Sequence, residues 1–181
     1  KAESGDQAGA VSVYQRLVSD ERAPVSAWFN LGYLQQELGH LSDAESSFRR
    51  ALALNPKLDQ AWYGLGLVLV RQRRLEESLT AFKRNTELQS MSPYAWYQMA
   101  RVHMELQDPD KALEVMRHLV AAGSDAHALE LQREFFVRYL QPAYRGFCGA
   151  AHKVELSNFY KAAVRLLEAF MDSDLAQFEM G

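Results

Sequence analysis

Apolar residues recur every three or four positions along most of the chain, with polar residues between them. Two such runs follow each other near the start, and they consist of Trp28, Leu31, Leu34 and Leu38, then Ala44, Phe48, Ala51 and Leu52. This spacing places each run on one face of an α-helix. Gly39 lies between the runs, where the end of a helix favours a residue with a left-handed backbone. The pattern predicts two helices joined by a short turn.

The same pattern returns along the chain at a fixed interval. All three tryptophans lie in Ala-Trp pairs, as Trp28, Trp62 and Trp96, and they are evenly spaced. We call the distance from one of these tryptophans to the next the repeat interval. Small residues follow each tryptophan at one fixed distance and large residues at another: Ala44, Ser78 and Ala112, then Phe48, Phe82 and Met116. Matched sizes at matched distances indicate one helical hairpin repeated three times.

With these positions the chain resembles the tetratricopeptide repeat family, whose unit has about 34 residues. The first unit carries the family's residues most completely, as Trp28, Leu31, Gly32, Ala44, Phe48, Ala51 and Pro56. Later units depart from the pattern at Asn85, Ser90, Leu119 and Ser124. The resemblance implies an all-α fold, a right-handed αα superhelix in which neighbouring units stack because one unit cannot bury its own apolar stripe.

The repeat divides the chain into parts of one domain, 1–181. We expect a partial repeat helix at 6–22, repeats at 24–57, 58–91 and 92–124, divergent capping helices at 125–171 and a tail at 172–181. Ser92-Pro93 and Asp108-Pro109 are expected to begin helices, because each places a capping side chain before a proline. The helix at 125–140 is expected to use Leu129, Phe136 and Leu140 on its apolar face, with Phe135 and Tyr139 alongside. A last helix is expected at about 154–171. The first helix is interpreted as the second half of a unit, in a piece excised or processed from a longer array.

Composition narrows the classes of function. The formal charge of −3 argues against a nucleic-acid surface, and no apolar stretch approaches the ~20 residues of a membrane helix. With 48% hydrophobic residues the chain is expected to be globular and soluble. The cytoplasm is slightly favoured, although the compartment is open because a targeting segment can lie outside this chain.

Candidate catalytic and metal-binding residues are sparse. Cys148 precedes His152 by four residues, but Gly146 and Gly149 argue against a regular helix there, and no acid is positioned to orient the histidine. His103 is interpreted as a packed core histidine. The chain carries no glycine-rich phosphate loop, zinc-protease pair or nucleophile elbow. We therefore predict a non-enzymatic protein without catalytic residues, metal or cofactor.

The resemblance implies that the first helix of each unit lines a concave surface. The expected peptide-binding groove there is aromatic and consists of Phe29, Asn30, Tyr33, Tyr63, Leu67, Arg71, Tyr94, Tyr97, Gln98 and Arg101. Tyrosine suits a protein-binding surface because it combines a large rigid area with a polar tip. The cationic clamp with which some members of the family hold a chaperone's C-terminal carboxylate is absent. We predict a scaffold that binds a peptide segment of a partner protein.

Three alternatives stay open. The domain could be a structural spacer in a larger assembly, with partners on its convex face or its ends. It could also be the regulatory repeat region of a larger enzyme whose catalytic domain is absent here. Finally, the acidic tail carries apolar residues such as Leu175 and Phe178, which suit the groove in the same or a second molecule.

Overall fold

The computed structural model describes residues 2–20, 22–90, 92–121 and 125–140. The helices in these ranges belong to two compact units, one formed by residues 1–90 and the other by residues 91–181. That the whole chain, 1–181, forms a single domain of repeats and capping helices stays a prediction.

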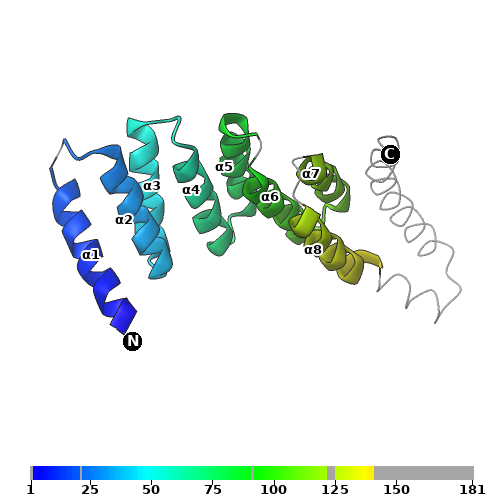
Figure 1. The fold of residues 1–181 in the computed structure, drawn as a ribbon, viewed down its shortest axis with the longest axis horizontal. Coiled ribbons are helices and arrows are strands. Elements are labelled where there is room, and N and C mark those ends of the chain that lie inside the picture. The colour runs from blue at the N-terminus through cyan, green and yellow to red at the C-terminus, as the bar shows by residue number, and fades with distance from the viewer. Residues whose placement is uncertain (1, 21, 91, 122–124, 141–181) are drawn as a thin grey trace, which may run out of the picture. The chain divides into compact units, whose positions relative to one another are not determined.

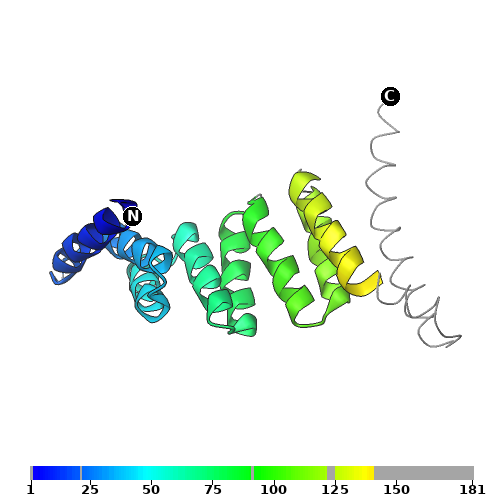
Figure 2. The same cartoon turned by 90° about the horizontal axis from the view of Figure 1, so that it is seen from below.

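The first unit contains five α-helices in its described ranges, and the described part of the second contains three. They are α1 (Ala2–Val18), α2 (Val25–Glu37), α3 (Leu41–Leu54), α4 (Asp59–Arg71), α5 (Leu75–Leu88), α6 (Pro93–Glu105), α7 (Pro109–Ala121) and α8 (Asp125–Phe135). A π-helical turn at Phe136–Leu140 follows α8. Figure 1 and Figure 2 show that successive helices of the first unit lie side by side.

The repeat found in the sequence determines where the helices begin. The first helices of the three hairpins begin at Val25, Asp59 and Pro93, and the second helices begin at Leu41, Leu75 and Pro109. Both series keep the repeat interval that separates the tryptophans. Within each hairpin the two helices pack along their length, as α2 with α3, α4 with α5 and α6 with α7. The predicted all-α fold of helical hairpin repeats is confirmed.

The core of the first unit depends on close contact between glycine and phenylalanine. Phe48 of α3 lies against Gly32 of α2 and Gly64 of α4, and Phe82 of α5 lies against Gly66 of α4. Both phenylalanine side chains are buried. These contacts bring the first and second helices close together, which the small residues of the repeat predicted.

An ionic cluster joins α3 and α5 at the surface of the first unit. Arg74 Nη1 donates to both carboxylate oxygens of Glu45, at 2.8 and 2.9 Å, and Arg74 Nε donates to Glu77 Oε1 at 2.7 Å. Burial raises the pKa of Glu45, but hydrogen bonds from Arg74 and Gln72 and the charge of Arg49 bring it below its ordinary value. Glu45 therefore stays ionised beside the apolar core.

The two helix starts predicted from a capping residue before proline differ in whether the capping side chain makes a hydrogen bond. Pro93 begins α6 as expected, but the Ser92 side chain makes no capping hydrogen bond. Asp108 does cap α7, because the Lys111 N–H donates to Asp108 Oδ1 at 3.2 Å. Proline alone therefore accounts for the start of α6, because it already has the helical φ and lacks an N–H that would need a partner.

The expected apolar face of the helix at 125–140 is partly wrong. Leu129 is exposed, and the buried residues of α8 are Ala128, Leu131 and Phe135. This stripe faces α6 and α7, on which α8 packs. The side chains of Phe136 and Leu140, the last helix expected at 154–171, the tail at 172–181, Cys148 and His152 all lie outside the described residues.

Candidate partner-binding face

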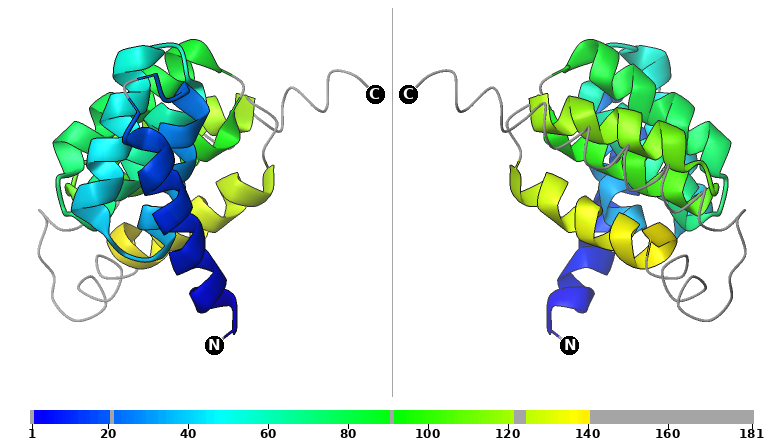
Figure 3. Two further views of the ribbon diagram at one scale, coloured as in Figure 1. Left: turned by 90° about the vertical axis from the view of Figure 1, so that its left-hand side faces the viewer. Right: turned by 90° about the vertical axis from the view of Figure 1, so that its right-hand side faces the viewer.

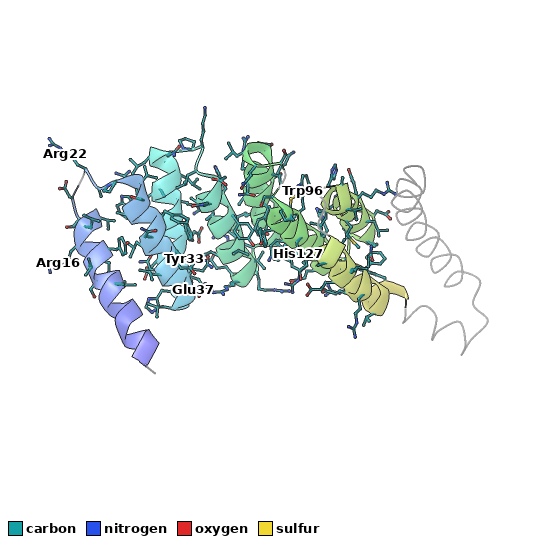
Figure 4. All side chains as sticks on the ribbon, in the orientation of Figure 1. Arg16, Arg22, Tyr33, Glu37, Trp96 and His127 are labelled. Atoms are coloured by element: carbon teal, nitrogen blue, oxygen red, sulfur yellow. The ribbon has the colours of Figure 1, made fainter. Side chains whose placement is uncertain are left out.

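Three of the predicted groove residues lie on α2, and each has a different environment. The ring of Phe29 lies 6.0 Å from that of Phe48, so it belongs partly to the core. Asn30 Nδ2 donates to the Tyr14 hydroxyl at 3.1 Å and holds α2 against α1. The Tyr33 side chain, by contrast, is 52% exposed and projects from α2 (Figure 4). Tyr33 is therefore the residue of this helix that offers the most surface to a partner.

The corresponding residues of α4 continue the face. The ring of Tyr63 lies 5.8 Å from that of Phe82, in the same way that Phe29 packs on Phe48. Leu67 is partly buried, and Arg71 is exposed at the end of the helix. Arg71 Nη1 donates to the backbone oxygen of Gln36 at 2.8 Å, which ties α4 to α2. We call the face formed by Phe29, Asn30, Tyr33, Tyr63, Leu67 and Arg71 the inner face of the first unit.

In the second unit the predicted residues meet α8. The ring of His127 lies 5.5 Å from that of Tyr94 and 5.3 Å from that of Tyr97, edge-on in both pairs. Figure 4 labels His127, the α8 residue of these pairs, together with Trp96 of α6, whose ring stacks on His118 of α7 at 4.7 Å. Tyr94 nevertheless remains 57% exposed.

Charged residues of α8 also reach this part of α6. Arg101 lies over the Tyr97 ring at 5.8 Å, and Arg101 Nε lies 3.8 Å from Glu134 Oε2. Burial raises the pKa of Tyr97, and a hydrogen bond with Glu130 raises it further. Tyr97 and Arg101 are therefore held by charged side chains of α8. Gln98, the remaining predicted residue of α6, is partly buried.

The structure thus sorts the predicted residues into two kinds. Tyr33, Arg71, Tyr94 and Arg101 are exposed, whereas Phe29, Tyr63 and Tyr97 are partly buried and pack against neighbouring rings. Sequence reasoning missed His127, which meets two of the tyrosines. Spacing along the chain gave no signal for this contact, because it depends on how α8 packs against α6.

Over the described part of the chain no three His, Cys, Asp or Glu residues come together as a group able to hold a metal ion. Within the same residues no helix has both the length and the apolar character needed to cross a membrane. His103 is buried, and burial lowers its pKa below the ordinary value.

Comparison with solved structures shows the same fold in another protein. A crystal structure of MamA is 20% identical in sequence, with a TM-score of 0.61 and coverage of 93% of both chains. MamA 41-end from Desulfovibrio magneticus RS-1 is 17% identical, with a TM-score of 0.60 and coverage of 96% of this chain and 88% of that chain. At these identities the likeness shows the fold alone. A comparison with curated protein sequences gives no significant match.

One protein family matches a range of this chain that contains most of the described helices. Residues 2–120 match the Cilia and flagella-associated protein 70 middle TPR-like domain, a range that includes α1 to α6 and nearly all of α7. The stacked helical hairpins are those of a protein-interaction scaffold. The chain belongs to the family of the Cilia and flagella-associated protein 70 middle TPR-like domain.

Proposed function

We propose that the protein binds a peptide segment of a partner protein on the inner face of its first unit. The observation that carries the proposal is the exposure of Tyr33 on a face whose other members are mostly aromatic or apolar. An exposed tyrosine beside half-buried rings gives a partner both apolar area and a hydroxyl for hydrogen bonding. Such residues dominate the energy of protein interfaces.

The rigid parts of this face support the proposal. Phe29 and Tyr63 are fixed by their contacts with Phe48 and Phe82, and Arg71 is fixed by its bond to Gln36. A partner that binds there does not have to order these side chains, so less conformational entropy is lost on binding. Arg71 is the cation of the face and favours a carboxylate in the bound segment.

Tyr94 and Gln98 offer a second, smaller area on α6. We infer that a partner contacts Tyr94 there more readily than Tyr97 or Arg101, since Tyr94 stays 57% exposed beside His127, whereas Tyr97 is partly buried and Arg101 lies beside Glu134 of α8. A peptide that needs Tyr97 or Arg101 has to displace His127 and Glu134. The second unit therefore contributes less accessible aromatic surface than the sequence predicted.

Selection of a random peptide library on the intact chain tests the proposal. The selected peptide is then located by hydrogen exchange of the protein with and without it. The proposal expects slower exchange in α2 and α4. Slower exchange confined to α3 and α5 would favour the structural spacer that uses the opposite face, and would overturn the proposal.

A further inference from the structure

The C-terminal part of α2 carries an exposed aromatic ring and an exposed carboxylate side by side. Glu37 follows Tyr33 by four residues, which places the two side chains one helical turn apart on the same side of the helix. Tyr33 is 52% exposed, and Glu37 is exposed as well. Figure 4 labels both residues on α2. We call the pair Tyr33 and Glu37 the acid–aromatic patch.

The first unit does not engage the acid–aromatic patch. Among the described residues, neither the Tyr33 nor the Glu37 side chain makes a hydrogen bond, an ion pair or a ring contact. In the left panel of Figure 3, α1 lies in front of the other helices of its unit. The hydrogen bond that joins α1 to α2 goes from Asn30 to Tyr14 and leaves Tyr33 exposed. Both groups are therefore open to a ligand.

The position of Glu37 lowers the stability of α2. Glu37 is the last residue of this helix, where the helix dipole carries a partial negative charge that repels a carboxylate. In α4 the residue one repeat interval later is Arg71, whose positive charge suits the end of a helix. The Glu37 carboxylate therefore has no stabilising role at its own helix end, and its charge is available for binding.

Arg71 lies next to the patch and keeps its charge. Its Nη1 atom donates to the backbone oxygen of Gln36, the residue before Glu37, at 2.8 Å. This bond uses one of the five N–H donors of the guanidinium, and Arg71 remains exposed. Among the described residues no ion pair joins Arg71 to Glu37. A cation and an anion are thus presented close together without neutralising each other.

A basic side chain is the group that the acid–aromatic patch fits. An ammonium or guanidinium group is attracted to the face of a tyrosine ring. The same group forms charge-assisted hydrogen bonds with a carboxylate. An acidic side chain would be repelled by Glu37, and an apolar one would remove water from the Glu37 carboxylate without giving it a partner. A basic side chain therefore satisfies both members of the patch at once.

We propose that Tyr33 and Glu37 bind an arginine or lysine side chain of the partner's segment. This inference rests on the proposed function, because Tyr33 belongs to the inner face. Arg71 favours a carboxylate, so the segment carries an acidic residue close to the basic one. Such a segment matches both charges, which a neutral or uniformly charged segment cannot do.

The first test selects a random peptide library on the intact chain and on the Glu37→Arg variant. Selection on the unchanged protein is expected to enrich arginine or lysine at one position of the peptides. Selection on Glu37→Arg is expected to lose this enrichment and to favour aspartate or glutamate there. Glu76→Arg makes the same change of charge at an exposed residue of α5 and is the matched control, with the enrichment of the unchanged protein.

The second test measures the affinity of one selected peptide by calorimetry. Glu37→Gln is expected to weaken binding about fivefold. Replacing the basic residue of the peptide by glutamate should weaken binding to the unchanged protein, and Glu37→Arg should restore it. Tyr33→Leu keeps apolar area but removes the ring face, so it should weaken binding, whereas Tyr33→Phe should not.

Thermal unfolding separates binding from a structural role. Glu37→Gln is expected to be at least as stable as the unchanged protein, because a carboxylate leaves the negative end of α2. Weaker binding together with lower stability would make Glu37 a structural residue and would overturn the inference. Peptides that slow hydrogen exchange in α2 and α4 but show no enrichment of basic residues would also overturn it, and would leave the proposed function standing. Peptides bound elsewhere would overturn both.

Discussion

At the scale of single residues, the first unit depends on glycines that lie under phenylalanine rings. A Cβ atom on Gly64 would lie 2.6 Å from Phe48 Cζ, and one on Gly66 would lie 2.5 Å from Phe82 Cε1. Both distances are shorter than van der Waals contact allows, so one additional methyl group would force the ring or the helix to move. Gly32 is less tight, at 3.0 Å from Phe48 Cδ1.

Gly66→Ala is therefore expected to lower the free energy of unfolding by about 1–2 kcal/mol, because the strain of overpacking, ~1–3 kcal/mol, exceeds the gain in helix propensity of at most ~1 kcal/mol. Urea denaturation measures the change. Gly9→Ala is the control, because no atom lies within 4 Å of its Cβ position and only the propensity gain applies. Equal effects of the two variants would contradict the packing argument.

His103 is the buried histidine of the described part of the second unit. Burial lowers its pKa, and the charge of Lys111 lowers it further, whereas Asp108 and Glu114 raise it. Its Nδ1 atom has no hydrogen-bond partner among the described residues. The folded protein therefore favours the neutral imidazole more strongly than the unfolded chain does.

The stability of the protein is expected to fall in mild acid through His103. Below about pH 6.5 the unfolded chain binds a proton that the folded chain resists, so the free energy of unfolding decreases as the pH falls toward the lowered pKa. Thermal unfolding from about pH 8 to about pH 5 measures this loss. His103→Gln removes the titrating group, so its melting temperature should fall less over the same range. Identical slopes for the two proteins would contradict the assignment.

At the scale of the elements, one turn is built three times with different residues. Gly39, Arg73 and Gln107 all have a positive φ, of 80°, 63° and 60°. In each turn the next N–H donates five residues back, from His40 to Gln35, from Arg74 to Leu69 and from Asp108 to His103. This bond pattern ends a helix in a left-handed residue, for which glycine is the favoured type.

Gln107→Gly is expected to stabilise the protein by about 0.5–1 kcal/mol, because a left-handed backbone costs a residue with a Cβ ~1–2 kcal/mol and glycine has more freedom to lose from the unfolded chain. Urea denaturation gives the difference. Gly39→Ala makes the reverse change at the equivalent turn and should destabilise by about 1 kcal/mol. A destabilising Gln107→Gly would show that the side chain matters more than the backbone.

The boundaries of the hairpin helices could be predicted from the sequence, but the buried face of α8 could not. The repeat interval predicts where the helices begin, because each hairpin packs through apolar residues at equivalent positions of the repeat. In α8 the apolar residues surround much of the helix, so spacing alone cannot show whether Leu129 or Leu131 faces α6. Packing against α6 and α7 buries Leu131 and leaves Leu129 exposed.

At the scale of the whole molecule, the position of the inner face follows from the repeat, but its accessibility does not. The register places Tyr33 and Tyr63 on first helices, and both are found there. Which of the predicted tyrosines is exposed depends on neighbours distant in the sequence: Phe82 packs on Tyr63, and His127 packs on Tyr97. The sequence predicts all of these tyrosines in one groove, whereas the structure favours Tyr33 as the one to replace because it is 52% exposed.

The affinity of a selected peptide for two single variants tests the proposed function most directly. Tyr33→Ala removes an exposed ring from the inner face, and Leu54→Ala removes an apolar side chain of similar exposure, 44%, from α3. Isothermal titration calorimetry is expected to show at least a tenfold loss of affinity for Tyr33→Ala, about 1.4 kcal/mol or more, and no loss for Leu54→Ala. Unchanged affinity for Tyr33→Ala, with loss for Leu54→Ala, would contradict binding on the inner face.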